Sequence, residues 1–178
     1  MTVETLRPNA VGDSSALTPF GAAANWDCCD ETPSDNDTSY VYSSDFDANP
    51  YLDLYNLVNT AIPAGSTINS VTVKANIKSI LTAAKATFRI ALKKSGGATQ
   101  YGSFQTPPTS YTVCSQVFAG VALSDLNDLQ VGIEITSRYY GPWDTYLHGR
   151  CTQVWVEIDY TLAGVAKQII MDGFILVT

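Results

Sequence analysis

The stretch YYGPWDTYLHGR at residues 139–150 combines four aromatic residues with the only histidine of the chain. Exposed aromatic rings can stack on sugar rings, so this loop is a candidate glycan-binding platform. The histidine has no serine or cysteine nucleophile motif beside it, which makes it weak support for catalysis. The candidate ligand or interface residues are Tyr139, Tyr140, Trp143, Tyr146 and His148.

Two other interpretations of this loop stay open. Gly141 and Pro142 are turn residues, so the loop can close a hairpin between two strands while its rings pack over the end of a sandwich. The same rings can also form a protein interface. We favour hairpin closure, which makes the loop structural or interfacial rather than catalytic.

Acidic residues cluster in a second irregular loop, at residues 27–37. Carboxylate oxygens are ligands that calcium prefers, and Asp30, Asp35 and Asp37 are the calcium candidates. The loop lacks EF-hand spacing, because the glycine and glutamate that such a loop requires do not follow Asp35. We therefore expect a solvated acidic loop and no cofactor, with calcium as the less favoured alternative.

Enzyme signatures are absent from the sequence, which holds no G-x-S-x-G, H-E-x-x-H or phosphate-binding glycine-rich motif. A glycosidase needs only two carboxylates close in space, and Glu134 with Glu157 is a pair that the sequence leaves open. Without a supporting motif, we predict that the protein is not an enzyme.

Alternation of apolar and polar residues predicts the elements that position these loops. Residues 67–80 alternate as a strand with one buried face does, and residues 85–94 repeat the pattern before a glycine-containing turn. We expect these two strands to form an antiparallel pair. Their expected inward residues are Val71, Val73, Ala75, Ile77, Ala86, Phe88, Ile90 and Leu92. Further strands are expected at residues 39–43, 51–57, 110–118, 130–137 and 150–162.

The fold class that follows is all-β, a two-sheet antiparallel β-sandwich of the jelly-roll kind. One short helix is expected at residues 123–130, where Ser124 can cap and leucines recur at helical spacing. At 178 residues, with no internal linker, the chain fits one domain. We assign residues 1–163 to the sandwich, with a long irregular region at 8–38, and residues 164–178 to an apolar C-terminal arm.

Composition limits the partners. The net charge of -7, from 17 acidic and 10 basic residues, argues against nucleic-acid binding. No signal peptide and no membrane-spanning run is recognisable, so we expect synthesis as a soluble cytosolic protein without membrane contact. The cysteines, Cys28, Cys29, Cys114 and Cys151, suit neither a disulfide scaffold nor a zinc site and are expected to be free thiols.

Two apolar features predict a surface that something covers. If Val154 and Val156 face the core, then Cys151 and Trp155 face outward from the last strand of the sandwich. The apolar arm also needs a cover, either its own sheet or a neighbour's. Cover of Trp155 by the same chain is an equal alternative to a subunit contact. The candidate interface residues are Trp155, Ile169, Ile170, Phe174, Ile175 and Leu176.

Several motifs resemble those of a known group of proteins. They are ETLRPNAVGD, NWDCCDETPSDNDTSYVYS, DLYNL, TINSVTV, LNDLQVGIEI and RCTQVWVEIDYT. The group comprises jelly-roll structural proteins encoded by tailed phages and related viruses, in which a W-x-C-x-D-E-like loop precedes an acidic D-x-D-T-x-Y-V element. The resemblance covers residues 4–161 and implies a virion component, made in the host cytoplasm.

We therefore expect a capsid decoration or auxiliary protein that binds and stabilises the capsid lattice. Its expected partners are a capsid or other virion structural protein and further copies of itself, with a trimer favoured. The alternative is a glycan-binding β-sandwich module of a virion fibre or tail, which would use the loop at residues 139–148.

Overall fold

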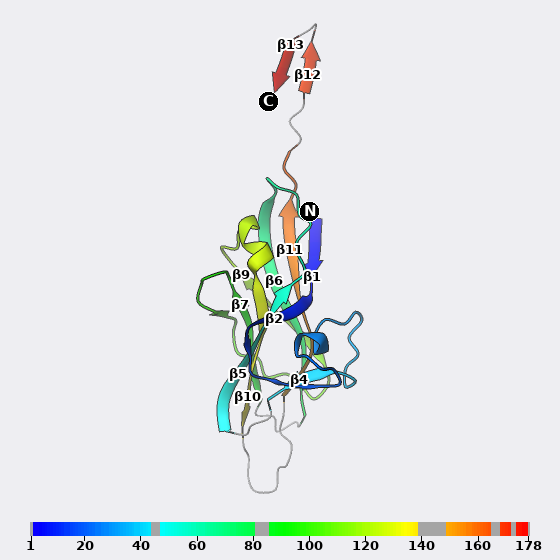
Figure 1. Ribbon diagram of the computed structural model, residues 1–178, viewed down its shortest axis with the longest axis vertical. Helices are drawn as coiled ribbons and strands as arrows, with labels where there is room; N and C mark the ends of the chain where they lie inside the picture. Colours follow the sequence, from blue (N-terminus) through cyan, green and yellow to red (C-terminus); the bar gives the residue numbers. More distant parts are fainter. Residues whose placement is uncertain are drawn as a thin grey trace.

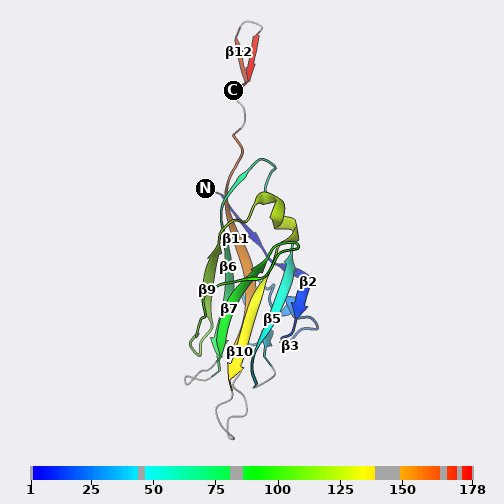
Figure 2. The same ribbon diagram turned by 90° about the vertical axis from the view of Figure 1, so that its left-hand side faces the viewer.

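A computed structural model describes residues 2–43, 47–80, 86–138, 149–164, 168–171 and 174–177. Two antiparallel sheets lie face to face (Figure 1), and the view in Figure 2 looks onto the outer face of one of them. The predicted all-β sandwich is therefore confirmed. No helix in the described ranges is long and apolar enough to span a membrane.

The six-stranded sheet has the order β3-β4-β11-β6-β9, and β1 also pairs with β11. Its two central strands, β6 and β11, are the longest of the described strands, with 13 residues each. The strands are β1 (Thr2–Leu6), β3 (Thr18–Phe20), β4 (Tyr40–Tyr42), β6 (Thr67–Ser79), β9 (Thr112–Phe118) and β11 (Gly149–Thr161).

The five-stranded sheet has the order β2-β5-β10-β7-β8. Its strands are β2 (Pro8–Ser15), β5 (Asp47–Leu57), β7 (Thr87–Lys93), β8 (Gln100–Tyr101) and β10 (Gln130–Arg138). From β5 to β7, and again from β8 to β11, each strand lies in the sheet opposite to the strand before it. This repeated crossing is the jelly-roll character of the fold.

The core lies between the inner faces of the two sheets. The eight residues predicted to face inward, seven on β6 and β7 and Ala86 just before β7, are at most 3% exposed, so their predicted burial is confirmed. The predicted pairing of these two strands is wrong, because β6 pairs with β11 and β9 whereas β7 pairs with β10 and β8. Alternation identifies the buried face of a strand, but strands that pack across a core show the same pattern as strands that pair.

The region predicted to be irregular, residues 8–38, contributes two strands to the sandwich. β2 pairs with β5 and β3 pairs with β4. The register of β2 shifts twice along β5, and such bulges interrupt the alternation by which a strand is recognised in a sequence. A short 3₁₀ helix, η1 (Trp26–Cys28), follows β3.

The predicted helix is present as a 3₁₀ helix, η2 (Leu123–Asp128), rather than an α-helix. Its N-cap is Ala122 and not Ser124, and the Asp125 carboxylate accepts the Ala122 backbone N–H at 2.9 Å. With Asp125 closing the turn, the predicted serine cap is not used.

The Asp53 carboxylate on β5 holds the N-terminal segment against the sandwich. The side chain is fully buried, and it accepts the backbone N–H groups of Ala16 at 2.7 Å and Leu17 at 2.9 Å. Asn25 Nδ2 and the Tyr55 hydroxyl donate to its other oxygen. Burial raises the pKa of Asp53 above its usual value, while these hydrogen bonds act in the opposite direction. One side chain thus connects β5 to two further parts of the chain.

A bulge in β11 corrects the predicted orientation of Cys151. Cys151 lies opposite Ile77 and Gln153 lies opposite Asn76, so Thr152 is an extra residue in the ladder. The alternation changes phase there, and the Cys151 side chain is 0% exposed rather than outward. Gln153 does face outward, but its amide donates to the carbonyl oxygen of Glu31, so the loop after η1 covers it.

The C-terminal arm contains two strands, β12 (Gln168–Met171) and β13 (Phe174–Val177). They form an antiparallel pair with each other, and in the described ranges they pair with neither sheet. The assignment of one sandwich domain followed by an arm stays a prediction.

Asp53→Ala is expected to lower the free energy of unfolding by about 3 kcal/mol, because buried donors, the Leu17 N–H foremost, lose their acceptor. Urea denaturation followed by fluorescence measures the change. Asp128→Ala is the matched control, since the Asp128 side chain is exposed on η2, and it should change stability by less than about 0.5 kcal/mol. Equal effects of the two substitutions would show that Asp53 is not an anchor.

Candidate functional site

The aromatic loop predicted as a ligand platform, with Tyr139, Tyr140, Trp143, Tyr146 and His148, lies outside the described residues. Its flanks are described: β10 ends in the five-stranded sheet and β11 begins in the six-stranded sheet. These two strands do not pair with each other. Hairpin closure, like the ligand and interface alternatives, concerns residues outside the described ones and stays a prediction.

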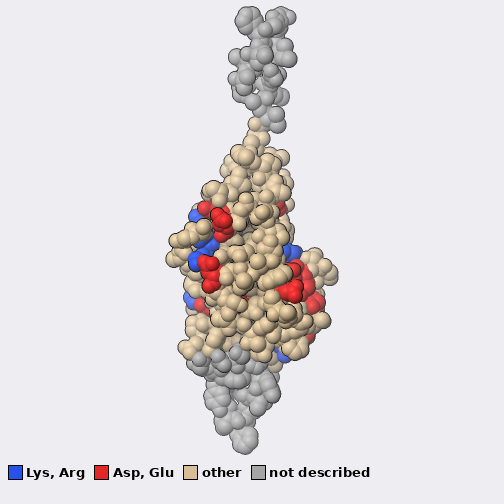
Figure 3. Space-filling view, viewed as in Figure 1, with Lys and Arg blue, Asp and Glu red and all other residues tan. Residues whose placement is uncertain are grey.

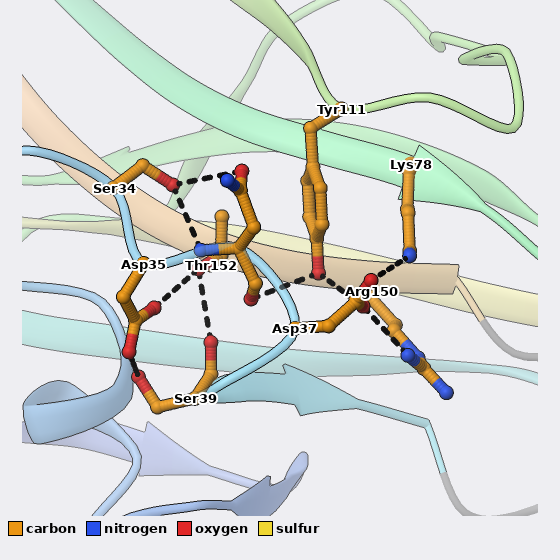
Figure 4. A network of polar contacts seen from close by, with 9 residues as sticks. Ser34, Asp35, Asp37, Ser39, Lys78, Tyr111, Arg150 and Thr152 are labelled. Carbon is orange, nitrogen blue, oxygen red and sulfur yellow. Dashed lines mark hydrogen bonds and ion pairs between the residues drawn. The ribbon is translucent and has the colours of Figure 1, made fainter.

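Of the calcium candidates, Asp37 is held by two cationic side chains (Figure 4). Its carboxylate accepts hydrogen bonds from Lys78 Nζ at 2.6 Å and Arg150 Nη1 at 2.7 Å, and from the Tyr111 hydroxyl at 3.2 Å. Burial opposes ionisation of Asp37, but these contacts outweigh it and hold its pKa below the usual value. The network attaches the acidic loop to β6 and β11.

The other two candidates do not join Asp37 around a metal position. Asp35 accepts hydrogen bonds from the Ser39 hydroxyl at 2.9 Å and the Thr152 hydroxyl at 3.1 Å. Burial and the neighbouring Asp27 raise the pKa of Asp30. In the described part of the chain, no three His, Cys, Asp or Glu side chains converge as metal ligands. The predicted calcium set is therefore not assembled.

Trp155 faces outward from the six-stranded sheet, as predicted, and is partly covered by its own chain. The Arg7 guanidinium carbon lies 5.8 Å from the Trp155 ring centroid. Trp155 Nε1 donates to Glu157 at 3.2 Å, and Glu157 pairs with Lys74 at 2.8 Å. Cover by the N-terminal segment, one of the two alternatives drawn from the sequence, accounts for part of its burial.

The candidate interface residues of the arm are cross-strand partners. Ile169 lies opposite Leu176, and Ile170 lies opposite Ile175. Phe174 begins β13 and lies opposite Met171. Only the backbone of these strands is described, so the role of the arm in an interface stays a prediction.

The outer face of the five-stranded sheet carries a cluster that the sequence reading missed, here called the Arg89 site: Arg89, Glu134, Tyr101 and Phe104. Arg89 on β7 and Glu134 on β10 are cross-strand neighbours joined by two hydrogen bonds, Nε–Oε1 at 2.7 Å and Nη2–Oε2 at 2.8 Å. The guanidinium carbon lies 4.1 Å from the Tyr101 ring centroid and 4.6 Å from that of Phe104. The arginine therefore contacts a carboxylate and two aromatic rings at once.

Burial differs sharply within the Arg89 site. The Glu134 side chain is 5% exposed and the Arg89 side chain 25%, whereas Tyr101 is 40% and Phe104 63% exposed. The backbone beside Phe104 is fixed to β7, since Gln105 and Phe88 exchange two hydrogen bonds of 2.8 and 2.9 Å. A largely buried ion pair thus lies against two exposed rings, and the backbone at or beside each ring is paired with β7.

The carboxylate pair considered for glycoside hydrolysis is separated by the sandwich. Glu134 belongs to the outer face of the five-stranded sheet, and Glu157, beside Trp155, to the outer face of the six-stranded sheet. Two packed sheets lie about 10 Å apart, so carboxylates on opposite outer faces exceed the separation of a hydrolase pair.

Two sequence signals point to the Arg89 site. Arg89 and Glu134 are charged residues at outward positions, each between two apolar neighbours in its strand. Phe104 is an aromatic residue in a segment that turn residues make look like an ordinary loop. Neither signal reveals that β7 and β10 are neighbours, which is why the cluster was not recognised.

No protein-family model and no curated protein sequence matches the chain. Among solved structures, the CBM22-1 xylan-binding domain of Paenibacillus barcinonensis Xyn10C is similar, with a TM-score of 0.45 and 9% identity over 84% of both chains. A likeness of this size carries no argument about ligands, so the function is argued from the site itself.

The Arg89–Glu134 pair can be tested for a structural role. Glu134→Leu alone should lower the free energy of unfolding by about 2 kcal/mol, because it leaves the half-buried Arg89 without its partner. The double variant Arg89→Met/Glu134→Leu should return to within about 1 kcal/mol of the wild type, since apolar residues of similar volume replace both charges. Urea denaturation of the three proteins measures this; a double variant as unstable as the single one would indicate that the fold requires the pair.

The Asp37 network should make stability depend on acid pH. Because the folded pKa of Asp37 is lowered, its contribution is present above the unfolded value of about 3.9 and is lost as the pH falls through the folded pKa. Asp37→Asn should therefore cost about 1 kcal/mol at neutral pH, from two partly exposed ion pairs, and progressively less below about pH 4. Denaturation at a series of pH values checks this, and a difference that stays constant would contradict it.

Proposed function

We propose that the protein is a non-catalytic carbohydrate-binding β-sandwich whose ligand binds at the Arg89 site. The observation that carries the proposal is the pairing of exposed rings, Tyr101 and Phe104, with a guanidinium that a buried carboxylate holds in place. A sugar has apolar C–H faces and polar hydroxyl edges. Aromatic rings suit the first, and charged hydrogen-bonding groups suit the second.

The exposure of Phe104 supports a ligand role over a packing role. Its side chain has no polar atom, yet it is 63% exposed, although the next residue, Gln105, is bridged to Phe88 on β7. A ring that served only to shield the ion pair would be stabilised by deeper burial. An incoming sugar would cover the remaining surface of the ring.

The burial of Glu134 supports the same interpretation. The free energy needed to remove an ion pair from water is about as large as the free energy gained from the attraction between its charges. Apolar residues at the same positions often stabilise a fold as well or better. Arg89 has five N–H donors, of which two bind Glu134, so donors remain for ligand hydroxyls. An arginine fixed in this way loses little side-chain entropy when it binds.

The proposal concerns binding and not hydrolysis, because Glu134 and Glu157 lie on opposite outer faces. The virion function expected from the sequence resemblance finds no support in the contacts of the described residues or in the comparisons. It stays a prediction, as do its capsid partner and trimeric state.

A glycan array with the wild-type protein, followed by titration calorimetry with the best ligand, tests the proposal. Phe104→Ala should weaken binding by about tenfold or more, through loss of the stacked ring. Arg89→Met/Glu134→Leu should abolish it while the protein remains folded. Val117→Ala, an exposed apolar residue of β9 on the other sheet, is the control and should bind as the wild type does.

The loop at residues 139–148 is the rival site for the same ligand. Trp143→Ala in the same titrations should leave binding unchanged. If Trp143→Ala abolished binding and Phe104→Ala did not, the ligand would bind at the loop. No glycan bound by the wild type would overturn the proposed function.

A further inference from the structure

A polar cleft of about 350 Å³ lies on the outer face of the five-stranded sheet, at the end nearest η2. Strands β2, β5 and β10, the turn after β7 and the helix η2 each contribute to it. Figure 3 shows acidic and basic side chains next to one another in this region, at the left of the view. The cleft is lined by Asp13, Asn56, Lys94, Ser95, Gly96, Asn127, Asp128 and Gln130.

A bulge in β2 forms one wall of the cleft. Val11 lies opposite Tyr55 and the next paired residue, Ser15, lies opposite Asp53, so residues 12–14 occupy the space of one residue on β5. Such an insertion leaves the plane of the ladder. Here it rises over the outer face of the sheet.

Contacts across the sheet hold this wall in place. Asp13 accepts a hydrogen bond from Gln130 Nε2 at 3.0 Å and pairs with Lys93, while its backbone N–H donates to Gln130 Oε1 at 3.0 Å. A Cβ on Gly12 would lie 2.6 Å from the Leu54 carbonyl oxygen, so glycine is needed for the close approach. The wall is therefore built into the fold and is not a loose turn.

In the described part of the chain, the side chains that keep free hydrogen-bonding groups in the cleft are two amides, the hydroxyl of Ser95 and one carboxylate. Asn127 Oδ1 accepts the Thr60 N–H at 3.0 Å, which leaves its Nδ2 donor free, and Asn56 donates to the Val11 carbonyl, which leaves its Oδ1 acceptor free. Asp128 has no partner in the described part of the chain. Mixed donors and acceptors of this kind suit hydroxyl groups.

The charges in the cleft argue against an ionic ligand. Lys94 is already paired with Asp125 at 3.1 Å, so its charge is neutralised and the cleft has no excess positive charge with which to bind an anion. One free carboxylate, that of Asp128, is too few for a hard cation, which takes six or more oxygen ligands. A neutral, hydroxyl-rich group is the remaining class.

The cleft and the Arg89 site share one face of one sheet, which Figure 2 shows toward the viewer. Arg89 and Lys93 are four residues apart on β7, which places the two sites roughly 13 Å apart along the strand. Between them lie Ala91 and its cross-strand neighbour Gly132. Ala91 is 0% exposed and Gly132 is also buried, so a ligand that reaches both sites passes over the groups that cover these two positions.

We infer that the polar cleft is a second subsite for the same ligand, and that this ligand is a chain of several neutral sugars lying along β7 and β10. The inference rests on the proposed function, to which it adds the ligand's length, charge and direction. The rings of the Arg89 site stack on one sugar, and the amides and the carboxylate of the cleft bind the hydroxyls of another.

Calorimetric titration with disaccharides and hexasaccharides of xylose, glucose and mannose, each linear and β-1,4-linked, tests the inference. The hexasaccharide of the preferred sugar should bind at least about tenfold more tightly than its disaccharide, because only the longer chain contacts both sites. Equal affinity for the two lengths would overturn the second subsite and leave the Arg89 site standing. If the protein bound none of these sugars, or bound charged glycans alone, the inference would be overturned. If the wild type also bound no ligand on the glycan array, the proposed function would be overturned too.

Two variants locate the effect in the cleft. Asn127→Asp removes the free donor and keeps the acceptor for Thr60, and Asp128→Ala removes the free carboxylate. Each should weaken hexasaccharide binding about fivefold and leave the disaccharide unchanged. Asp27→Ala, which removes an exposed carboxylate of η1, is the matched control. Cleft variants that bind the hexasaccharide as the wild type does would contradict the inference.

Discussion

A single buried carboxylate, that of Asp53, gives the N–H of Leu17 and the shared N–H of Ala16 an acceptor at the point where β2 leaves its sheet. Buried backbone groups need such partners, so the N-terminal segment can lie against the sandwich only where β5 supplies an acceptor. The same contact fixes the end of the bulged strand β2, and with it the wall of the polar cleft. The N-terminal segment and the wall of the polar cleft therefore depend on one side chain whose own burial is unfavourable.

The outer face of the five-stranded sheet shows a similar balance between stability and specific contacts. Two apolar side chains at positions 89 and 134 would suit the stability of the sheet as well. Arg89 and Glu134 occupy these positions instead, and the Glu134 side chain is almost completely buried. The energy of the pair in isolation does not account for its presence. The pair contributes geometry. Glu134 fixes the Arg89 guanidinium by two hydrogen bonds, and this places the free N–H donors of Arg89 in a defined position beside the two rings.

Alternation in the sequence was sufficient to identify most of the strands and the residues that fill the core, because side-chain direction has a fixed period in any sheet. It could not identify partners: β6 and β7 have equally regular patterns and belong to different sheets. Bulges account for the other failures, since one extra residue at Thr152 reversed the predicted direction of Cys151, and the insertion in β2 concealed a whole strand. The Arg89 site combines residues from two strands and a loop, so it became visible only when the strand order was known.

The crossing of successive strands between the sheets also has a consequence for how the chain reaches this structure. Among the described strands, β1, near the start of the sandwich, pairs with β11 alone, near its end, and β11 is also the partner of β4 and β6. Nearly every ladder therefore joins segments distant in sequence, a topology associated with slow folding. During synthesis the six-stranded sheet lacks its central strand until β11 has left the ribosome. Until then, the edges of β1, β4 and β6 that pair with β11 in the folded protein lack this partner.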